Sequence, residues 1–302
     1  MTDETWPDLP YAAWKDTYAT LHRWMQVVGK IAVNHGPALN HSWGSAFQVT
    51  PRGLSTRTLY SGVRSFTFEF DFIDERLILH TSDAHIAALP LVPLSVADFY
   101  AAVMAMCQKA GLPVKVWSMP VEIPDPVRFE QDRAHHTYQG AYGETLWRIL
   151  VQVDRVLNLH RGTFVGKSSP VHFFWGAPDL AVTRFSGRIA PPRDPEEPLF
   201  MREAYSHEVI SHGFWPGGDM LPEPVFYAYA APVPAGFSEA RIKPEAAYYH
   251  AELKEFVLPY KALRASANPD QMLRDFVDST YEKAATLAGW PQELLRTPSP
   301  TA

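Results

Sequence analysis

The pattern that most constrains the fold is a strict alternation of apolar and polar residues at positions 66–72. Phenylalanine occupies every second position there, and the residues between are threonine, glutamate and aspartate. Successive side chains of a β-strand point to opposite faces of a sheet, so this segment is expected to form a strand with one apolar face. The Asp-Glu pair at 74–75 can turn the chain into a second strand at 77–81. The sequence therefore predicts a β-hairpin with one face in the core.

Other segments have the three-and-four spacing of apolar residues that is typical of amphipathic helices. They cover residues 12–33, 95–111, 144–160 and the segment after Asn268. Ser95 is a capping-box-like start, and Asn268 followed by Pro269 is a typical helix N-terminus. A further helix is expected to begin at Pro244.

Additional strands are expected where apolar residues alternate or lie between turn signals. These segments are 41–50, 114–119, 171–175, 180–185, 203–211 and 225–231. The proline-rich stretch 189–200 predicts an irregular loop. Together the elements predict an α+β fold, an antiparallel sheet with flanking helices.

The order of elements predicts two halves joined by a linker. The N-terminal α+β half, the linker and the C-terminal α+β half are expected at residues 1–125, 126–143 and 144–302. Each half has a long helix and then a strand with a Trp-Gly pair. This order is consistent with two weakly similar helix-plus-meander halves that pack as one unit. In a duplicated fold, His41 and His172 would be equivalent residues beside a shared pocket.

Composition excludes several classes of function. The 27 basic and 33 acidic side chains give a formal charge of -6, so neither nucleic acid nor a membrane surface is an expected partner. Cys107 is the only cysteine, which excludes an intramolecular disulfide and cysteine-rich metal sites within one chain. The acidic start MTDETWPDLP lacks a secretory pattern, and the apolar stretches are too short to span a membrane. A cytoplasmic location is therefore expected.

Two segments resemble known functional motifs but lack the residue spacing that those motifs require. The loop at 162–168 has three residues between its glycines and follows a helix, whereas a phosphate-binding loop needs four and follows a strand. His207 and His212 are five residues apart, so they do not share the helix face that a zincin motif requires. A serine-nucleophile elbow and a dinucleotide-binding glycine fingerprint are missing from the sequence.

Long segments resemble an uncharacterised bacterial family designated only as a domain of unknown function. The similar motifs include WPDLP and TLHRW, SPVHFFWG with VTRFSGR, and REAYSHEV with GFWPGG, and they extend over nearly the whole chain. The resemblance implies no established activity or cofactor. It implies counterparts of six residues, which are His22, His41, His135, His172, His207 and Glu208. The chain departs from the family at Gly44, where many relatives have histidine, and at His212, where a small residue is usual.

The leading hypothesis is a cytoplasmic small-molecule enzyme with a histidine-bearing, aromatic-lined pocket and a divalent metal. Its expected metal ligands are His41, His172 and His207. Imidazole and carboxylate ligands suit iron, zinc or manganese, which favours oxygenase- or hydrolase-type chemistry. Glu208 would serve as ligand or general base, and Arg184 would orient a substrate carboxylate or phosphate. The expected pocket walls are Trp43, Phe174, Trp175, Phe214 and Trp215.

Four alternatives stay open at this point. A metal-free enzyme could use His207 and Glu208 as an acid–base pair. A non-catalytic protein that binds a small ligand would need only the aromatic pocket. The histidines and tryptophans could instead serve a large mixed core. A single histidine could also act as an axial ligand of haem.

Overall fold

The computed structural model describes residues 4–294, and these form two compact units. The first unit comprises Leu9–Val151 and Phe173–Pro178. The second unit comprises the described residues up to Asp8, then Gln152–His172, and then the chain from Asp179 onward. Residues 126–143, the predicted linker, thus lie within the first unit, and the chain passes into the second unit within a helix at Val151. The predicted duplication of the two halves stays a prediction.

The first unit contains a long helix, a group of antiparallel strands and a second helix. Its elements are α1 (Tyr11–His35), β1 (Phe47–Val49), β2 (Gly53–Thr56), β3 (Leu59–Ser61), β4 (Arg64–Asp71), β5 (Arg76–Thr81), β6 (Ile86–Pro90) and α2 (Val96–Lys109), with single 3-10 turns at η1 (Asn40–Ser42) and η2 (Phe129–Gln131). The strands follow the order β1-β2-β4-β5-β6, and β3 also pairs with β4. Phe47 of β1 pairs in addition with Phe173 of β7 (His172–Phe174).

The predicted phenylalanine hairpin is confirmed in β4 and β5. Phe68 lies opposite Leu79, and the phenylalanines at 66, 68, 70 and 72 are all buried. On the opposite face of the strand Thr67 and Glu69 are half-buried. The apolar face of β4 reaches helix α2, where Phe70 stacks on Phe99.

Helices α1 and α2 supply the rest of this core, and both are confirmed at close to their predicted bounds. Trp24 of α1 stacks on Phe99 of α2 with ring centroids 4.7 Å apart. The Ser95 hydroxyl accepts a hydrogen bond from the backbone N–H of Asp98 at 3.1 Å, which is the predicted helix cap.

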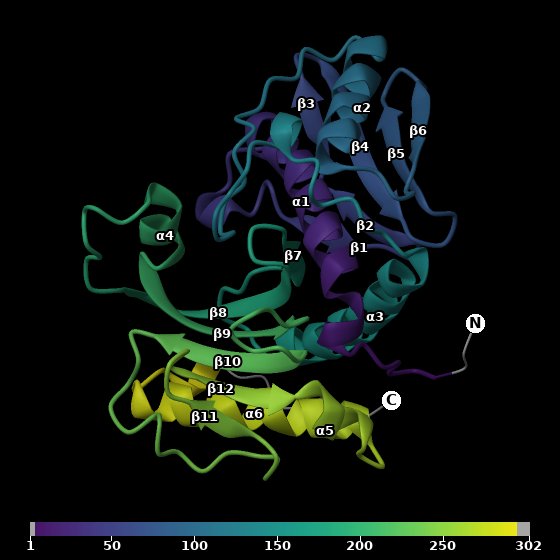
Figure 1. Ribbon diagram of the computed structural model, residues 1–302. Coiled ribbons are helices and arrows are strands. Elements are labelled where there is room, and N and C mark those ends of the chain that lie inside the picture. Colours follow the sequence, from purple (N-terminus) through teal and green to yellow (C-terminus); the bar gives the residue numbers. More distant parts are fainter. Residues whose placement is uncertain (1–3, 295–302) are drawn as a thin grey trace. The chain divides into compact units, whose positions relative to one another are not determined.

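The second unit has a sheet with a helix along one face. Its elements are the later part of α3 (Gly140–Gly162), β8 (Asp179–Ile189), α4 (Leu199–Ala204), β9 (His207–Trp215), β10 (Val225–Ala231), β11 (Tyr248–His250), β12 (Glu255–Pro259), α5 (Tyr260–Arg264), α6 (Pro269–Leu287) and η3 (Gln292–Leu294). The strands follow the order β8-β9-β10-β12-β11 with antiparallel pairing. Helix α6 runs along this sheet (Figure 1).

Helix α6 begins as predicted, because Asn268 accepts from the backbone N–H of Gln271 and Pro269 occupies the first turn. The first described residues of the chain also belong to this unit. The Trp6 indole N–H donates to Asp270 at 3.2 Å, and the Tyr260 hydroxyl donates to the Pro7 carbonyl at 2.7 Å.

Four sequence-based expectations are wrong in whole or in part. The strand expected at 203–211 begins only at His207, because Leu199–Ala204 form helix α4. Residues 114–119 form no strand and lie between Pro113 and Pro120, where prolines deprive a strand of ladder hydrogen bonds. No helix begins at Pro244, because a turn there leads into β11, which pairs with β12. The strand expected at 41–50 is reduced to 47–49, since residues 40–42 form a 3-10 turn.

Within residues 4–294 the chain has six α-helices and twelve strands, all with antiparallel pairing where a register is defined. The predicted α+β class with an antiparallel sheet is therefore confirmed. No helix in this part of the chain is both long enough and apolar enough to cross a membrane.

Candidate functional site

The sheet of the second unit has one face against helix α6 and one face rich in tyrosine. His212 of β9 marks the helix side, because its Nε2 lies 3.0 Å from the Thr280 hydroxyl of α6. Residues of opposite parity on β9 point to the other side. There Ser211 lies opposite Tyr229 and Gly213 lies opposite Tyr227, both on β10. This side, formed by Asp179, Tyr205, Tyr227, Tyr229 and Glu255, is called the tyrosine face below.

The strand register extends a row of polar residues across the tyrosine face. Thr183 of β8 lies opposite Ser211, and their hydroxyls are 3.0 Å apart. Glu255 of β12 lies opposite His250 of β11. Continuing the β10–β12 register by one residue from the pair Ala228 and Phe256 puts Glu255 beside Tyr229. Side chains from five strands thus meet on one face.

Gly213 allows the ring of Tyr227 to lie flat across strand β9. A Cβ at position 213 would come within 2.4 Å of the ring's Cζ and hydroxyl oxygen, so any side chain there would displace the ring. From this position the Tyr227 hydroxyl donates a hydrogen bond to the Asp179 carboxylate. The Gly213–Tyr227 pair therefore fixes both the ring and the direction of its hydroxyl.

The three tyrosines form the aromatic part of the face. The rings of Tyr227 and Tyr229 are nearly parallel, with an interplanar angle of 19° and centroids 6.1 Å apart. Tyr205 is inclined by 56° to Tyr229, and its hydroxyl donates to the Tyr229 oxygen at 3.3 Å. Burial raises the pKa of Tyr227 and Tyr229 well above the usual tyrosine value, so both remain protonated at neutral pH.

Glu255 is the titratable group of the tyrosine face that changes charge near neutrality. Burial raises its pKa from 4.5 to about 7, because the half-buried carboxylate loses hydration. A carboxyl with this pKa can give up or accept a proton at neutral pH. Strongly shifted carboxyl groups are common in catalytic sites, which makes Glu255 a candidate acid or base.

The sequence pattern predicts the two tyrosines of this face but not its glutamate. Tyr227 and Tyr229 alternate with alanines in the correctly predicted strand 225–231. The sequence does not indicate a role for Glu255, because a helix is expected from Pro244 onward and no strand is expected around residue 255. Its assignment to the face depends on the pairing of β12 with β10.

The predicted base Glu208 lies at the start of β9, where its carboxylate is hydrogen-bonded to two side chains of β8. Its carboxylate accepts from the Ser186 hydroxyl at 2.9 Å and from Arg188 Nε at 2.8 Å. Arg188 also donates to the carbonyls of Ala288 and Gly289, just after helix α6. Glu208 therefore joins β9 to the end of α6 through Arg188.

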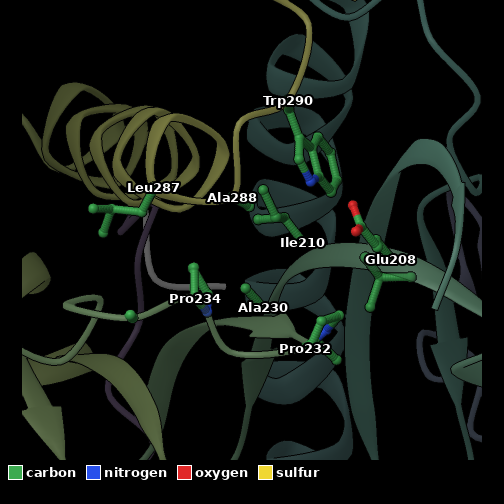
Figure 2. Close-up of a pocket in the computed structure, with 11 residues that line it drawn as sticks. Glu208, Ile210, Ala230, Pro232, Pro234, Leu287, Ala288 and Trp290 are labelled. Atoms are coloured by element: carbon green, nitrogen blue, oxygen red, sulfur yellow. The ribbon is translucent and has the colours of Figure 1, made fainter. Parts of the chain in front are cut away.

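Glu208 also lines a small pocket of about 220 Å³, otherwise bounded by apolar side chains. Its walls include Ile210, Pro232, Pro234, Leu287 and Trp290. Figure 2 shows the Glu208 carboxylate on the same side of the pocket as the Trp290 indole. The carboxylate thus lies beside an apolar space while it is paired with Arg188.

The three predicted metal ligands occupy different elements. His41 lies in the first unit, in η1, with a positive φ of 56° and its ring stacked on Trp43. His172 is buried at the start of β7, and His207 is half-buried at the start of β9 beside the Ser206 hydroxyl. The part of the chain that the structure describes has no group of three or more His, Cys, Asp or Glu side chains that could hold a metal ion. The metal hypothesis stays a prediction.

Arg184, the predicted substrate-orienting residue, is in the core of the second unit and is 1% exposed. Its guanidinium lies 5.0 Å from the Phe164 ring and 4.3 Å from the Tyr281 ring, measured to the centroids. It donates to the His160 carbonyl and to the Thr163 hydroxyl. Burial lowers the pKa of Arg184 to about 10, so the group remains charged at neutral pH. This environment suits a structural role.

The predicted aromatic wall is distributed over both units. Trp175 is buried against Gly29 of α1 and donates its indole N–H to the Ser45 carbonyl at 2.9 Å. Trp43 and Phe174 are half-buried in the same unit. In the second unit Phe214 is completely buried against Phe226 and Tyr260, whereas Trp215 is half-buried.

Two further histidines singled out by the family resemblance hold loops of the first unit. His22 Nε2 lies 2.8 Å from the Gly176 carbonyl, and burial lowers its pKa to about 4. His135 Nδ1 lies 2.8 Å from the buried Asp132 carboxylate. The His22 contact fixes loop backbone beside α1, and the His135 contact joins two side chains within one loop.

The family comparison agrees with the resemblance seen in the sequence. The model of a family of unknown function, DUF5996, matches residues 6–297. The chain belongs to the DUF5996 family. No curated protein and no solved structure matches this DUF5996 chain. Its chemistry must therefore be inferred from its own residues.

Proposed function

We propose that this DUF5996 protein is an acid–base enzyme that acts on a small polar molecule at the tyrosine face of the second unit. The observation that carries the proposal is the position of Glu255, half-buried beside Tyr229 and with a pKa near neutrality. Glu255 would remove a proton from the bound molecule when ionised and return one when protonated.

The tyrosines would position the reacting molecule. Tyr205, Tyr227 and Tyr229 remain protonated at neutral pH, since burial raises the pKa of each. Asp179 holds the Tyr227 hydroxyl by a hydrogen bond and thereby orients it. Pre-oriented hydroxyl groups beside a proton-transferring carboxyl favour reactions in which a proton moves at a carbon or a heteroatom.

Two observations favour Glu255 over the acid–base pair expected from the sequence. Glu208 forms a salt bridge with Arg188 at 2.7 Å and accepts a hydrogen bond from the Ser186 hydroxyl, so its carboxylate already has protein partners. His207 and Glu208 are adjacent in β9, so their side chains point to opposite faces of the sheet, and the His207 ring lies beside the Ser206 hydroxyl. A metal bound by histidines remains a separate hypothesis, and chelation tests it.

Proton exchange with solvent tests the proposal without knowledge of the net reaction. The purified chain is incubated in D2O with a panel of small carbonyl compounds, hydroxy acids and amines, and exchange of C–H groups is followed by NMR. Wild-type protein is expected to accelerate exchange or conversion of a panel member. Glu255→Gln is expected to lower that rate by about 100-fold or more, because it cannot accept the proton.

Matched variants separate the alternatives. Glu252→Gln removes an exposed carboxyl near β12 and should leave the rate unchanged. Glu208→Gln should also leave it unchanged, whereas a loss would favour the acid–base pair at His207 and Glu208. Retention of activity after chelation supports the proposal, and loss would favour the metal hypothesis. A wild-type protein that exchanges or converts no panel member, or a fully active Glu255→Gln variant, contradicts the proposal.

A further inference from the structure

We infer that the tyrosine face recognises a small organic cation, an amine or an alkylammonium group. This inference names the ligand class of the site proposed above and rests on that site. It is carried by the combination of three tyrosine rings with the carboxyl groups of Asp179 and Glu255 on one face of the sheet.

The ring geometry suits a cation. Tyr227 and Tyr229 are nearly parallel, and Tyr205 is inclined by 56° to Tyr229, so ring faces point in two directions at the same place. The face of an aromatic ring carries partial negative charge and attracts a cation, and rings inclined to each other can contact one alkylammonium group from two sides.

The tyrosine face offers mainly hydrogen-bond acceptors, which favours a ligand that donates hydrogen bonds. The hydroxyl proton of Tyr227 is directed to Asp179, and that of Tyr205 is directed to Tyr229. Oxygen lone pairs therefore remain on the phenols and on Glu255, and these accept hydrogen bonds. An ammonium group offers donors only, so it complements this surface.

A cation of the chain already uses one of these rings. The guanidinium of Arg193, in the loop between β8 and α4, lies 4.8 Å from the centroid of Tyr205 and forms a salt bridge with Glu197. This contact indicates that the aromatic cluster attracts positive charge. Asp179 and Glu255 add negative charge, so a carboxylate or phosphate ligand would be repelled there.

A pair of isosteric probes gives the sharpest test. Choline carries a quaternary ammonium, and 3,3-dimethyl-1-butanol has a neutral carbon in its place. Both are titrated into the full-length protein near pH 8 and followed by calorimetry and by NMR of the tyrosine rings. Choline is expected to bind, and the neutral isostere to bind at least about ten-fold more weakly, because only choline can form cation–π contacts. Equal affinity for the two probes, or tighter binding of acetate, overturns the inference.

Variants locate the binding to the tyrosine face. Tyr229→Leu removes a ring and should weaken choline binding about ten-fold, whereas Tyr229→Phe keeps the ring and should retain most of the affinity. Tyr60→Leu removes an exposed tyrosine of the first unit and should change nothing. Arg193→Ala removes the competing guanidinium and should leave the affinity equal or higher. If Tyr229→Leu, folded as judged by circular dichroism, binds choline as wild type does, the inference is wrong.

The test is independent of turnover. If neither choline nor propylammonium binds but a neutral molecule is processed through Glu255, the cation inference fails and the proposed function stands. If these cations bind and no panel member exchanges or is converted, the proposed function fails and the cation site stands.

Discussion

The ring of Tyr227 on β10 covers the Cα of Gly213 on β9, so that position 213 has no room for a side chain. The distance from an added Cβ to the ring's Cζ would be 2.4 Å, and its distance to the Leu180 carbonyl oxygen would be 2.6 Å. The sequence GFWPGG at 213–218 reads as a turn signal, yet its first glycine lies inside a strand. A glycine inside a strand often marks a place where another group approaches the backbone closely.

Gly213→Ala is expected to destabilise the protein by about 2 kcal/mol or more, because the methyl group would overlap both the ring and the carbonyl. Urea unfolding monitored by fluorescence measures the change. Gly162→Ala is the matched control, since a Cβ there meets nothing within 4 Å, and it should change the free energy of unfolding by about 0.5 kcal/mol or less. Similar losses for the two variants would contradict the prediction.

Acid should destabilise the protein through its buried histidines. Burial holds the pKa of His22 at about 4 and those of His160 and His212 well below 6.5. Below pH 6.5 the unfolded chain takes up protons on these residues and the folded chain does not. Stability is therefore fully present above pH 6.5 and falls as pH decreases, by up to about 1.4 kcal/mol per pH unit for each histidine.

Urea unfolding at pH 7.5, 6 and 5 measures this dependence. His212→Asn removes one of the titrating groups and should flatten the decrease, while its effect at pH 7.5 reports the lost contact with Thr280. His80→Asn replaces an exposed histidine and should leave the slope unchanged. A slope equal to wild type in His212→Asn would be evidence against the prediction.

Glu255 should act in the opposite direction. Its pKa is raised from 4.5 to about 7 in the folded protein, so between these values the folded chain holds a proton that the unfolded chain has lost. The stability from this group is full below pH 4.5 and is lost as pH rises through 7. Glu255→Gln cannot titrate and should become more stable relative to wild type by about 1–2 kcal/mol between pH 5 and pH 8. Thermal unfolding of both proteins across this range would reveal a pH-independent difference if the prediction is wrong.

Arg184 should matter for stability whatever the reaction. Its guanidinium is held between Phe164 and Tyr281 and donates to the Thr163 hydroxyl at 3.0 Å. Arg184→Ala is expected to cost about 3 kcal/mol or more, because it leaves a cavity and removes hydrogen bonds in the core. Arg184→Lys should restore only part of this, since an ammonium cannot reproduce the planar contacts of the guanidinium. Chemical denaturation gives the values, and an Arg184→Ala variant as stable as wild type would support the substrate-orienting role expected from the sequence.

The elements that the sequence predicted well are those whose local pattern and tertiary environment agree. The phenylalanines of 66–72 alternate because one side of β4 is buried, and Asn268 and Pro269 act on the backbone directly beside them. The helix expected at Pro244 failed because a proline suits both a helix start and a turn, and pairing with β12 decided between them.

The candidate site was less predictable for the same reason. Histidine and tryptophan stand out in composition, yet His22 and Trp175 bond to loop carbonyls. Glu255 gains its distinctive acidity only from burial beside strands that are remote in sequence, and no local pattern carries that information.

The hydrogen bond between Trp6 and Asp270 affects how the chain can fold during translation. These residues are separated by 264 positions, and Pro7 likewise waits for Tyr260. During synthesis Trp6 leaves the ribosome well before Asp270 does. Its indole therefore lacks this partner until α6 has been made. A chaperone that captures nascent chains would find an apolar target there until α6 has been made. The second unit therefore cannot be completed before α6 has been made, although Trp6 and Pro7, which belong to it, are made more than 250 residues earlier.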